Sequence, residues 1–286
     1  MSKLVVIPDT KESIVDYFNN DCFVIVGIDG FSVNTLNINM DELTELLSIN
    51  NNIFVSLNKN ILNSELKCLE SLLIDISKLN VKGVFYYDVC VLNIVNRLNL
   101  DINLIWSAEH LTTNYFTVNY WYKNGIKGTY LSSEITYDEI KDISLNTKCK
   151  LFVQLFGYIS MYVSKRHAIK NYLKHFNIEN SAKEYKLYKE DKLYSIKDNN
   201  DGTTIYTDFI LNGLKESLLL KDSIDYIVLN AYKIDTKDML DVIDIYSSVN
   251  NDNIEVLENR LTNIFNNLSK GFLYEETIYR VKKYDK

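Results

Sequence analysis

The distribution of hydrophobic and polar residues divides this chain into short apolar runs that alternate with longer segments of helical period. The runs are rich in β-branched and aromatic residues and are nearly continuous in their apolar character, as is typical of strands that are covered on both faces. Eight such runs are predicted to be strands: Lys3–Ile7, Phe23–Ile28, Ile53–Leu57, Gly83–Tyr87, Asn103–Trp106, Gly128–Leu131, Leu151–Leu155 and Tyr226–Leu229.

The segments between these runs have the pattern of amphipathic helices. Between Glu65 and Leu79, leucine and isoleucine recur along one stripe. Asn63–Glu65 and Thr136–Glu139 place capping residues and carboxylates where a helix would begin. Strands that alternate with helices in this way predict an α/β fold, and eight of them favour a (β/α)8 TIM-type barrel. A doubly wound open sheet is the alternative, because periodicity does not show whether a sheet closes.

One connection is much longer than the others. About seventy residues separate the seventh predicted strand from the eighth, which is more than a loop and one helix require. Within it the pattern predicts a helix and a small β excursion closed by turn residues: Ala168–Phe176, Tyr185–Tyr188, Leu193–Ile196 and Thr203–Tyr206. We therefore predict one barrel domain over residues 1–286, with an insertion at about 157–210 over the C-terminal mouth of the barrel, where the active sites of such barrels lie.

The composition is that of a folded protein, with 47% hydrophobic and 24% charged residues. No apolar stretch approaches the length of a membrane span, and Pro8–Asp9 ends the first apolar run too early for a signal peptide. We expect a cytoplasmic protein without a membrane partner. The four cysteines lie far apart and show no metal-ligand spacing, which predicts reduced, buried thiols: Cys22, Cys68, Cys90 and Cys149.

Charge is distributed unevenly along the chain. The formal net charge is −7, but Ser164–Lys197 contains nine Lys and Arg residues against four Asp and Glu residues. Tyrosines are interleaved with these lysines, and the combination of basic groups with aromatic rings is what RNA contact requires. A solvated surface accounts for the same lysines equally well. RNA contact through residues 164–197 is therefore one of two interpretations.

Common catalytic patterns are absent from the sequence: there is no GxSxG, HExxH, GxGxxG or P-loop. Glu109 and His110 are adjacent on a predicted loop, where solvated polar residues are commoner than metal ligands, and we predict no metal site. Polar residues do follow the predicted strands, at the end where a barrel gathers its chemistry. They are Asp9, Asp29, Asn58, Asp88, Ser107, Glu109, Ser132, Ser133, Glu134, Gln154 and Asn230. Any one of them can simply satisfy a backbone group, but together they predict a polar mouth.

Several segments occur in an order that is similar to a known family. They are Gly27–Ser32, Ser107–Asn114, Trp121–Ile126, Leu131–Ile135, Phe152–Gly157, Ser164–His167, Asn171–Tyr172, Glu190–Tyr194 and Asp201–Tyr206. This order resembles the collagenase-like peptidase family, the thirty-second of the unknown-type peptidase families. In that family a strand ends at a glycine and leads to a Ser-Gly-Arg-Cys element and an Asn-Tyr pair. The resemblance covers nearly the whole chain.

The chain departs from the family where many members hold an iron–sulfur cluster. Ser160 and His167 stand where those members have two signature cysteines, and the next element, shortened to about Asn180–Tyr185, contains none. Thiolates are the ligands of such clusters, so we predict a branch without the cluster and without any cofactor. The last strand is followed by Asn230–Tyr232 in place of the family's Glu-Gly-Arg-like element, which removes both charges.

The resemblance implies two kinds of activity. The family name implies a peptidase or other hydrolase, whereas other branches act in the hydroxylation of RNA bases or quinone precursors, often with a cluster or a small-molecule hydroxyl donor. Peptide hydrolysis needs a nucleophile within reach of a base. Ser164 and His167 are close in sequence, but three residues apart is no triad. A non-catalytic binding protein is a third alternative, so whether the chain is an enzyme stays open.

We predict that the barrel mouth binds a small anion or a peptide, in a site centred on Arg166. A guanidinium suits the bidentate capture of a carboxylate or phosphate. A structural ion pair of Arg166 with Glu134 or Asp208 is the alternative. The candidate catalytic residues are Glu134, Gln154 and His167. The candidate ligand-binding residues are Arg166, Ser164, Lys165, Asn114 and Ser107.

Overall fold

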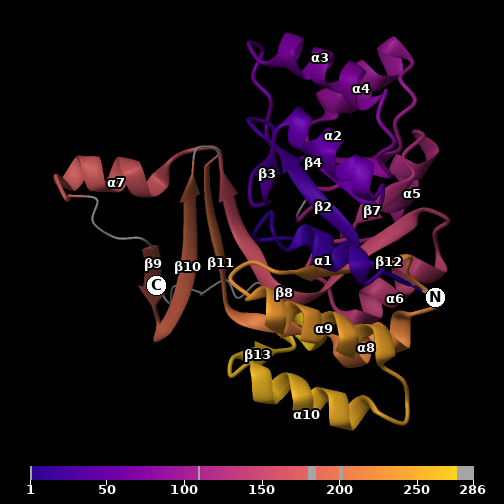
Figure 1. Ribbon diagram of the computed structural model, residues 1–286, viewed down its shortest axis with the longest axis vertical. Coiled ribbons are helices and arrows are strands. Elements are labelled where there is room, and N and C mark those ends of the chain that lie inside the picture. Colours follow the sequence, from indigo (N-terminus) through magenta and orange to yellow (C-terminus); the bar gives the residue numbers. More distant parts are fainter. Residues whose placement is uncertain (1, 109, 180–184, 200–201, 276–286) are drawn as a thin grey trace, which may run out of the picture.

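The computed structural model of the chain describes residues 2–108, 110–179, 185–199 and 202–275. Eight parallel strands form its centre: β1 (Lys3–Ile7), β2 (Phe23–Ile28), β4 (Ile53–Leu57), β5 (Gly83–Tyr86), β6 (Leu104–Trp106), β7 (Gly128–Tyr130), β8 (Lys150–Ser164) and β12 (Tyr226–Asn230). The order is β12-β1-β2-β4-β5-β6-β7-β8, and β8 also pairs with β12. The sheet therefore closes, which confirms the predicted TIM-type barrel and excludes the open sheet (Figure 1).

Helices follow most of the strands and cover the outside of the barrel (Figure 1). They are α1 (Ile14–Asn19), α2 (Met40–Ile49), α3 (Leu66–Ile76), α4 (Val89–Leu98), α5 (Tyr115–Lys123), α6 (Tyr137–Leu145), α8 (Leu214–Leu220), α9 (Thr236–Ser248) and α10 (Ile254–Ile264). Short elements complete this part: β3 (Asn37–Ile38), β13 (Leu268–Ser269) and a 3-10 helix at Gly271–Tyr274. None of the helices in the described part of the chain is long and apolar enough to cross a membrane.

Of the two helix starts that the sequence predicted, the structure confirms the capping residues of one and contradicts those of the other. At α6, Thr136 and Glu139 form the capping box that the sequence predicted, each accepting a backbone N–H of the other. At α3, the predicted cap at Asn63–Glu65 is wrong, because Glu65 occupies the N-cap position without capping the helix. Its carboxylate instead accepts hydrogen bonds from Leu62 N and Lys165 Nζ. The side chain is used for a tertiary contact that the local pattern cannot reveal.

The inside of the barrel is closed at the end where the strands begin. Five buried aromatic rings pack there in one cluster, with neighbouring ring centroids 4.2–5.8 Å apart: Phe23, Phe54, Phe85, Phe152 and Tyr226. Side chains two residues apart on a strand point to the same face, so these rings mark the inward positions. Rings of this size leave little free space in a barrel of eight strands.

Further along the same inward positions, the side chains become smaller and more polar. On β4, Phe54 is followed by Ser56 and then, just past the strand, by Asn58; on β8, Phe152 is followed by Gln154. On β12 the last inward residue is Asn230. The barrel is therefore packed at its N-terminal end and hollow and polar at its C-terminal end.

The long connection forms a projection that we call the arm, residues 158–212. β8 runs for 15 residues and continues out of the barrel, beyond its predicted end at Leu155. It pairs there antiparallel with β11 (Gly202–Asn212), and β11 pairs in turn with β10 (Lys192–Asn199), which pairs with β9 (Tyr185–Lys189). Gly157 has a φ of +97°, and a Cβ at this position would lie 2.1 Å from the carbonyl oxygen of Asn230. A glycine is thus required where β8 leaves the barrel.

In its described residues the arm carries one helix, α7 (Ala168–Phe176), with the bounds that the sequence predicted. The far part of the arm, with α7 and β9, extends away from the barrel (Figure 1). The base of the arm lies beside the C-terminal ends of the barrel strands, because β8 and β12 remain paired up to Phe156 and Leu229.

The four thiols are all free. Cys22 and Cys149 are buried, as predicted, and Cys90 is partly buried. Burial raises the pKa of Cys22 and of Cys90 to about 12, in the case of Cys90 with help from the carboxylate of Asp88. Cys68 is exposed on α3, so the prediction of buried thiols is wrong at this position. Cys68 lies outside the buried stripe of this helix, which is formed by Leu69, Leu72, Leu73 and Ile76.

Candidate functional site

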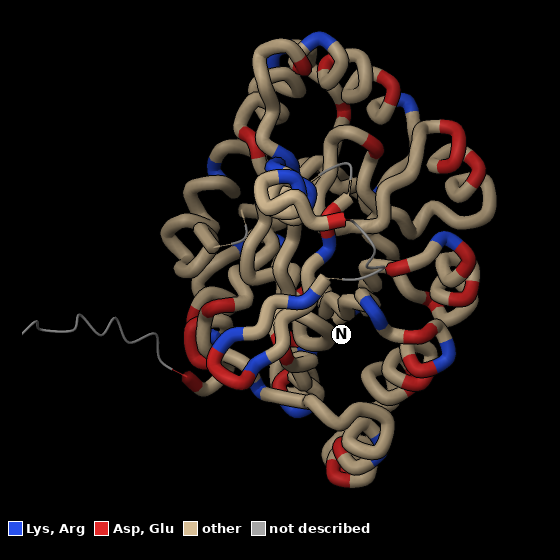
Figure 2. Tube along the Cα trace, turned by 90° about the vertical axis from the view of Figure 1, so that its left-hand side faces the viewer, with Lys and Arg blue, Asp and Glu red and all other residues tan. Residues whose placement is uncertain are grey.

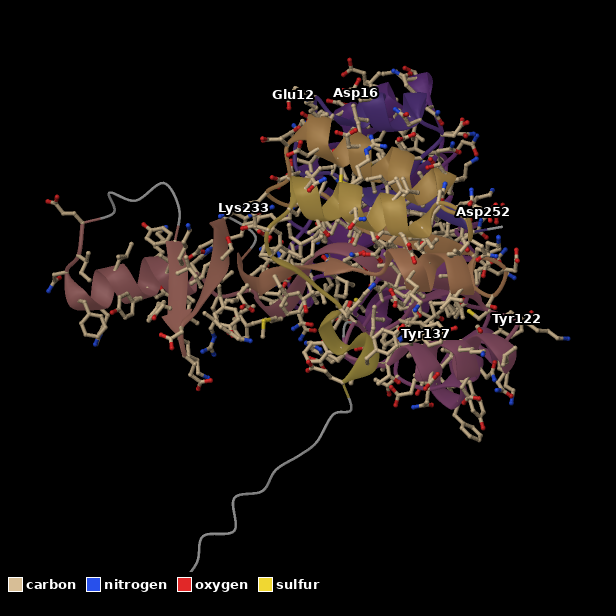
Figure 3. The ribbon with its side chains drawn as sticks, turned by 90° about the horizontal axis from the view of Figure 1, so that it is seen from below. Glu12, Asp16, Tyr122, Tyr137, Lys233 and Asp252 are labelled. Carbon is tan, nitrogen blue, oxygen red and sulfur yellow. The ribbon has the colours of Figure 1, made fainter. Side chains whose placement is uncertain are left out.

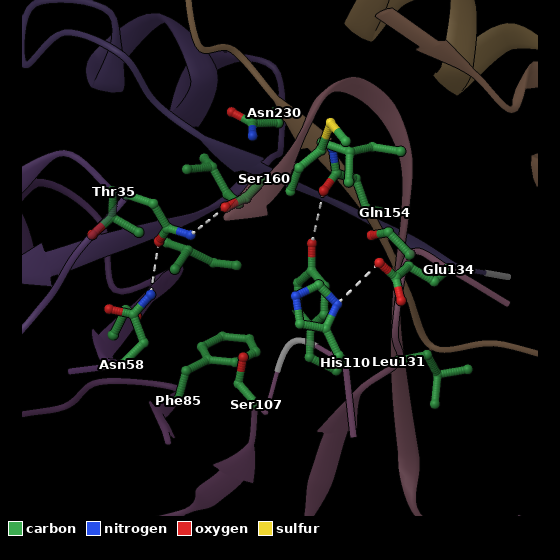
Figure 4. A pocket seen from close by; sticks show the side chains of 18 of the residues that line it. Thr35, Asn58, Phe85, Ser107, His110, Leu131, Glu134, Gln154, Ser160 and Asn230 are labelled. Carbon is green, nitrogen blue, oxygen red and sulfur yellow. Dashed lines mark hydrogen bonds and ion pairs between the residues drawn. The ribbon is translucent and has the colours of Figure 1, made fainter. Parts of the chain in front are cut away.

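A pocket of about 130 Å³ opens at the C-terminal end of the barrel strands. We call it the mouth pocket. Its walls combine apolar side chains with hydroxyl and amide groups from several strand ends, among them Asn58, Ser107, Gln154 and Asn230 (Figure 4). The only titratable side chains other than tyrosine among its described lining are His110 and Glu134. The pocket is therefore a largely neutral hydrogen-bonding site with a single carboxylate and imidazole at one side.

One wall of the mouth pocket is a loop that Asn58 holds in place. Its Oδ1 accepts hydrogen bonds from Ser32 Oγ and Val33 N, both at 2.8 Å, and its Nδ2 donates to Asn34 Oδ1 at 2.8 Å. Asn34 has a φ of +57°, a conformation that asparagine tolerates better than most residues. Its own Nδ2 donates to Ser160 Oγ at 3.3 Å (Figure 4). The loop after β2 is thereby joined to the base of the arm.

The Gln154 amide belongs to a residue that is only 7% exposed. Its Nε2 donates to the carbonyl oxygens of Phe156 and Tyr158, at 3.3 and 3.0 Å. Its Oε1 accepts from the Tyr130 hydroxyl at 3.3 Å. Asn230 Nδ2 donates to the same Tyr158 carbonyl at 3.0 Å. These bonds orient the amide and fix the point where β8 turns out into the arm.

On the wall opposite the Asn58 loop, the side chains of His110 and Glu134 contact each other, with His110 Nδ1 3.3 Å from Glu134 Oε1 (Figure 4). About half of each side chain is exposed. A carboxylate bonded to one ring nitrogen orients an imidazole and leaves the other nitrogen available. The pair can therefore hold or move a proton at the rim of the pocket.

The structure brings together three of the predicted site residues, Ser107, Glu134 and Gln154, in the mouth pocket. Asn114 lies apart from them, because its side chain caps α5 by accepting from Thr117 N at 2.9 Å. The remaining four belong to the arm. Ser160 lines the pocket, and Ser164 lies four strand residues further out, about 13 Å at ~3.3 Å per residue.

On the arm, the predicted residues mostly hold each other and the barrel. Ser164 Oγ accepts from Arg166 N at 3.2 Å, and His167 Nδ1 lies 3.5 Å from Asp198 Oδ1. Lys165 Nζ donates to Glu65 Oε2 at 2.8 Å and to Asn60 O at 3.1 Å. The Lys165 hydrogen bond, with further bonds from Leu62 N and Lys59, lowers the pKa of Glu65 to about 2 despite its partial burial.

Arg166 is exposed, and within the described part of the chain it forms no ion pair. Glu134 contacts His110 instead, so the structural pair that we considered for Arg166 is not formed with it. The guanidinium is therefore free to meet an external anion.

Sequence reasoning missed part of the pocket. Asn34, Thr35, Tyr130 and Ser160 line it, and none of them directly follows a barrel strand. His110 was considered only as a metal ligand beside Glu109, which lies outside the described residues. The available signal was the polar run after β2 and the position of Ser160 in the family signature, but only the closed barrel shows that both reach one pocket.

The residues of this chain do not fit an iron–sulfur cluster. Ser160 lines the mouth pocket and His167 faces Asp198, and neither is a thiolate. Within the residues that the structure describes, no three His, Cys, Asp or Glu side chains gather in a metal-binding group. We expect protein purified under anaerobic conditions to be colourless, with iron far below one atom per chain; a brown protein with about four irons would contradict this assignment.

The closed fold and the mouth pocket together define an α/β-barrel protein with a polar pocket at the carboxyl ends of its strands. The sequence profile of Peptidase family U32 matches residues 15–282. The chain belongs to this family, which confirms the resemblance found in the sequence.

One curated relative and two solved structures are similar to this chain. The curated tRNA hydroxylation protein P2 of Bacillus subtilis (strain 168) is 28% identical over 257 residues, which cover 79% of this chain and 81% of that protein. The solved structure of the U32 peptidase Mk0906 superposes with a TM-score of 0.51 at 11% identity, covering 81% of this chain and 93% of that one, and it shows the shared fold. The tryptophan synthase α2β2 complex from Pyrococcus furiosus superposes with a TM-score of 0.44 at 12% identity, over 91% and 96% of the two chains.

Proposed function

We propose that this protein takes part in the hydroxylation of tRNA, with the arm binding the RNA and the mouth pocket receiving a base or a small ligand. One observation carries the proposal: the basic, aromatic arm is continuous with the wall of the pocket. Ser160 and Met161 belong to the arm and line the pocket, and the basic residues begin with Lys165, directly after the end of the same strand. The tRNA hydroxylation protein of Bacillus subtilis, 28% identical to this chain, agrees with it.

The surface chemistry of the arm suits a nucleic acid. Lys186, Lys189 and Lys192 are exposed on β9 and β10, and no ion pair with a described carboxylate neutralises them. Tyr188 and Tyr172 are 67% and 55% exposed. Exposed rings can stack on bases while ammonium groups meet phosphates. Figure 2 looks onto the side from which the arm projects, and places Lys and Arg along it.

Arg166 fits this proposal as a phosphate contact. In the sequence it lies between the pocket residues of β8 and the lysines of β9 and β10, and its guanidinium can bind a phosphate through two parallel hydrogen bonds. The small anion that we predicted for this residue is, in this proposal, a backbone phosphate of the RNA. The neutral amides and hydroxyls of the mouth pocket then suit the uncharged edges of a base.

The peptidase alternative has less support from the geometry. Among the described residues no serine hydroxyl is hydrogen-bonded to a histidine ring; Ser164 accepts from Arg166 N, and His167 faces Asp198. Nucleophilic hydrolysis needs such a contact between nucleophile and base. Glu134 and His110 form the one carboxylate–imidazole pair of the pocket, and they serve proton transfer in either activity.

The test is RNA binding followed by modification. Wild-type protein and the triple variant Lys186→Gln, Lys189→Gln, Lys192→Gln are titrated with tRNA at several salt concentrations. We expect tight binding at low salt that weakens steeply as salt rises, and a shallower dependence in the variant, because each lost phosphate contact reduces the slope by about 0.7–0.9. Lys183, also part of the predicted RNA contact, lies outside the described residues and is left unchanged.

A matched control removes three exposed lysines elsewhere, Lys67, Lys141 and Lys237. The same variants are then expressed in a Bacillus subtilis strain that lacks its tRNA hydroxylation protein P2, and hydroxylated nucleosides are measured by mass spectrometry. Wild-type and control proteins should restore the modification, and the arm variant should not. If the wild type binds no tRNA at low salt, the lysines are a solvated surface and the proposal fails.

A further inference from the structure

Lysines gather at the end of the barrel opposite the mouth. Lys82 directly precedes β5, Lys127 directly precedes β7, Lys148 lies two residues before β8, and Lys150 begins it. Parallel strands of a barrel all begin at the same end, so the topology brings these four residues together although they lie far apart in the sequence. The protein is acidic overall, with a net charge of −7, so this concentration of basic residues is local.

The four lysines line one hollow of about 290 Å³, which we call the lysine hollow. Its floor is formed by the aromatic rings that close the barrel, with Phe152 and Tyr226 stacked at 4.2 Å. Asn103 and Tyr122 complete the rim. Tyr122 lies at the end of the molecule away from the arm (Figure 3). The lysine hollow is therefore separate from both the mouth pocket and the RNA surface proposed on the arm.

The positive charge of this hollow has no internal partner. None of the described residues that line it is acidic, and none of its four lysines forms an ion pair within the described chain. An adjoining hollow of about 280 Å³ shares Lys150 and adds Lys3 and Lys221. Two carboxylates also line this adjoining hollow, Asp222 and Asp225, and Asp225 accepts a hydrogen bond from Leu151 N at 2.9 Å. Ammonium groups held close together without a counter-charge repel one another, and an anion bound among them would relieve that repulsion.

The helix dipole would be a simpler explanation for the clustering of these lysines. The helices of a barrel end near the point where its strands begin, and lysines stabilise helix C-termini. This effect falls off within the last turn of a helix. Lys82 lies six residues beyond the end of α3 and Lys127 four residues beyond the end of α5. Both residues are thus outside that range, so the helix dipole does not account for these two members of the cluster.

We infer that the lysine hollow is a second anion site, for a ligand that carries more than one phosphate group. All four cations are lysines, which bind phosphate as point charges, whereas planar carboxylates are matched best by arginine. The charges come from three different strands, and adjacent strands lie about 4.8 Å apart, so they are spread too widely for a single phosphate group. The ligand is either a free oligophosphate compound, such as a nucleoside triphosphate, or the backbone of a bound RNA.

The experiment compares two quadruple variants of the full-length protein. The first is Lys82→Gln, Lys127→Gln, Lys148→Gln, Lys150→Gln. The second removes four exposed lysines elsewhere, Lys67, Lys141, Lys215 and Lys237, and so changes the net charge equally. Tripolyphosphate and ATP are titrated by calorimetry, and tRNA by filter binding, all at one fixed ionic strength. Thermal melting without ligand reports whether each variant is folded.

We expect the first variant to lose at least tenfold in affinity for a phosphate probe, and the second to change less than twofold. A loss for tripolyphosphate and ATP identifies a free oligophosphate as the ligand, and a loss for tRNA alone identifies the RNA backbone. Equal affinities of the two variants for all three probes would overturn the inference. So would a lower melting temperature of the first variant with unchanged affinities, since the lysines would then be structural. Because the arm is untouched, either result leaves the proposed tRNA function to its own test.

Discussion

The barrel and the arm are built from the same kinds of residues but are stabilised in different ways. In the barrel, α3 buries a stripe of apolar side chains: Leu69, Leu72, Leu73 and Ile76. In the arm, α7 has a comparable amphipathic sequence and buries none. Large apolar side chains that a barrel helix would cover are open to solvent on the arm, for example Phe176 at 56% and Tyr188 at 67%.

This difference shows what each region can be used for. The barrel gains its stability from burial, so its apolar positions are committed to the core. The arm is attached by its strand ladder and by polar contacts with the barrel, such as the Ser195 hydroxyl with the Tyr232 hydroxyl at 3.1 Å and Lys165 with Glu65. Its exposed rings and lysines remain available for a partner, as an interaction surface requires.

The largest expected effect is a difference in stability loss between an alanine substitution in the barrel and one in the arm. Phe152→Ala removes a ring that is 1% exposed and packs against Phe85 and Tyr226, and we expect a loss of about 3–5 kcal/mol in the free energy of unfolding. Phe176→Ala on the arm should change it by less than about 0.5 kcal/mol. Chemical denaturation of both variants measures this. Similar losses of unfolding free energy in the two variants would mean that the arm has a core of its own, and would contradict the difference between the two regions.

A smaller effect on the free energy of unfolding is expected from the contact between Lys165 and Glu65, which attaches the arm to the barrel. The pKa of Glu65 is lowered from 4.5 to about 2, first of all by Lys165. A carboxyl group whose pKa is lower in the folded state stabilises the fold at pH values above its pKa in the unfolded state. This stabilisation is lost as the pH falls from about 4.5 towards 2. We expect Glu65→Gln to be less stable by about 1–2 kcal/mol at pH 7, after allowance for solvent screening, and the difference to vanish near pH 2.

Urea unfolding at pH 7 and at decreasing pH measures this difference, with Glu45→Gln, an exposed carboxyl on α2, as the control. A loss that stays constant down to pH 2 would show that the charge of Glu65 is not what holds the arm.

The smallest effect on stability should come from Arg166→Lys. Because Arg166 is exposed and unpaired within the described chain, we expect its melting temperature to stay within about 1 °C of the wild type. Affinity for tRNA should fall several-fold, since lysine keeps the charge but loses the bidentate geometry. Arg97→Lys, on the far side of the barrel in α4, is the control. A melting temperature several degrees lower with unchanged affinity would make Arg166 a structural residue.

Much of the fold could be predicted because its signals are local. All eight barrel strands and α7 were found from periodicity, and their ends agree with the structure within about two residues, except at β8. The error at β8 has a physical reason: beyond Gly157 the strand leaves the barrel and pairs with β11 instead, and its side chains become more exposed. Backbone pairing leaves no signature in the hydrophobic pattern of one strand.

The eight strands and the polar groups at their ends could be predicted from the sequence, because inward alternation and strand-end positions follow from period and chain direction. The closure of the sheet is seen only in the pairing of β8 with β12, and the polar groups that share a site are likewise seen only in the folded chain. It brings Ser107, Glu134 and Gln154 together with His110 and Asn34, and it carries Arg166 and His167 away on the arm. The reason is that β8 leaves the barrel at Gly157, where the chain passes so close to Asn230 that no side chain fits. A contact between residues more than seventy positions apart decides the direction of the arm, and no local pattern records it.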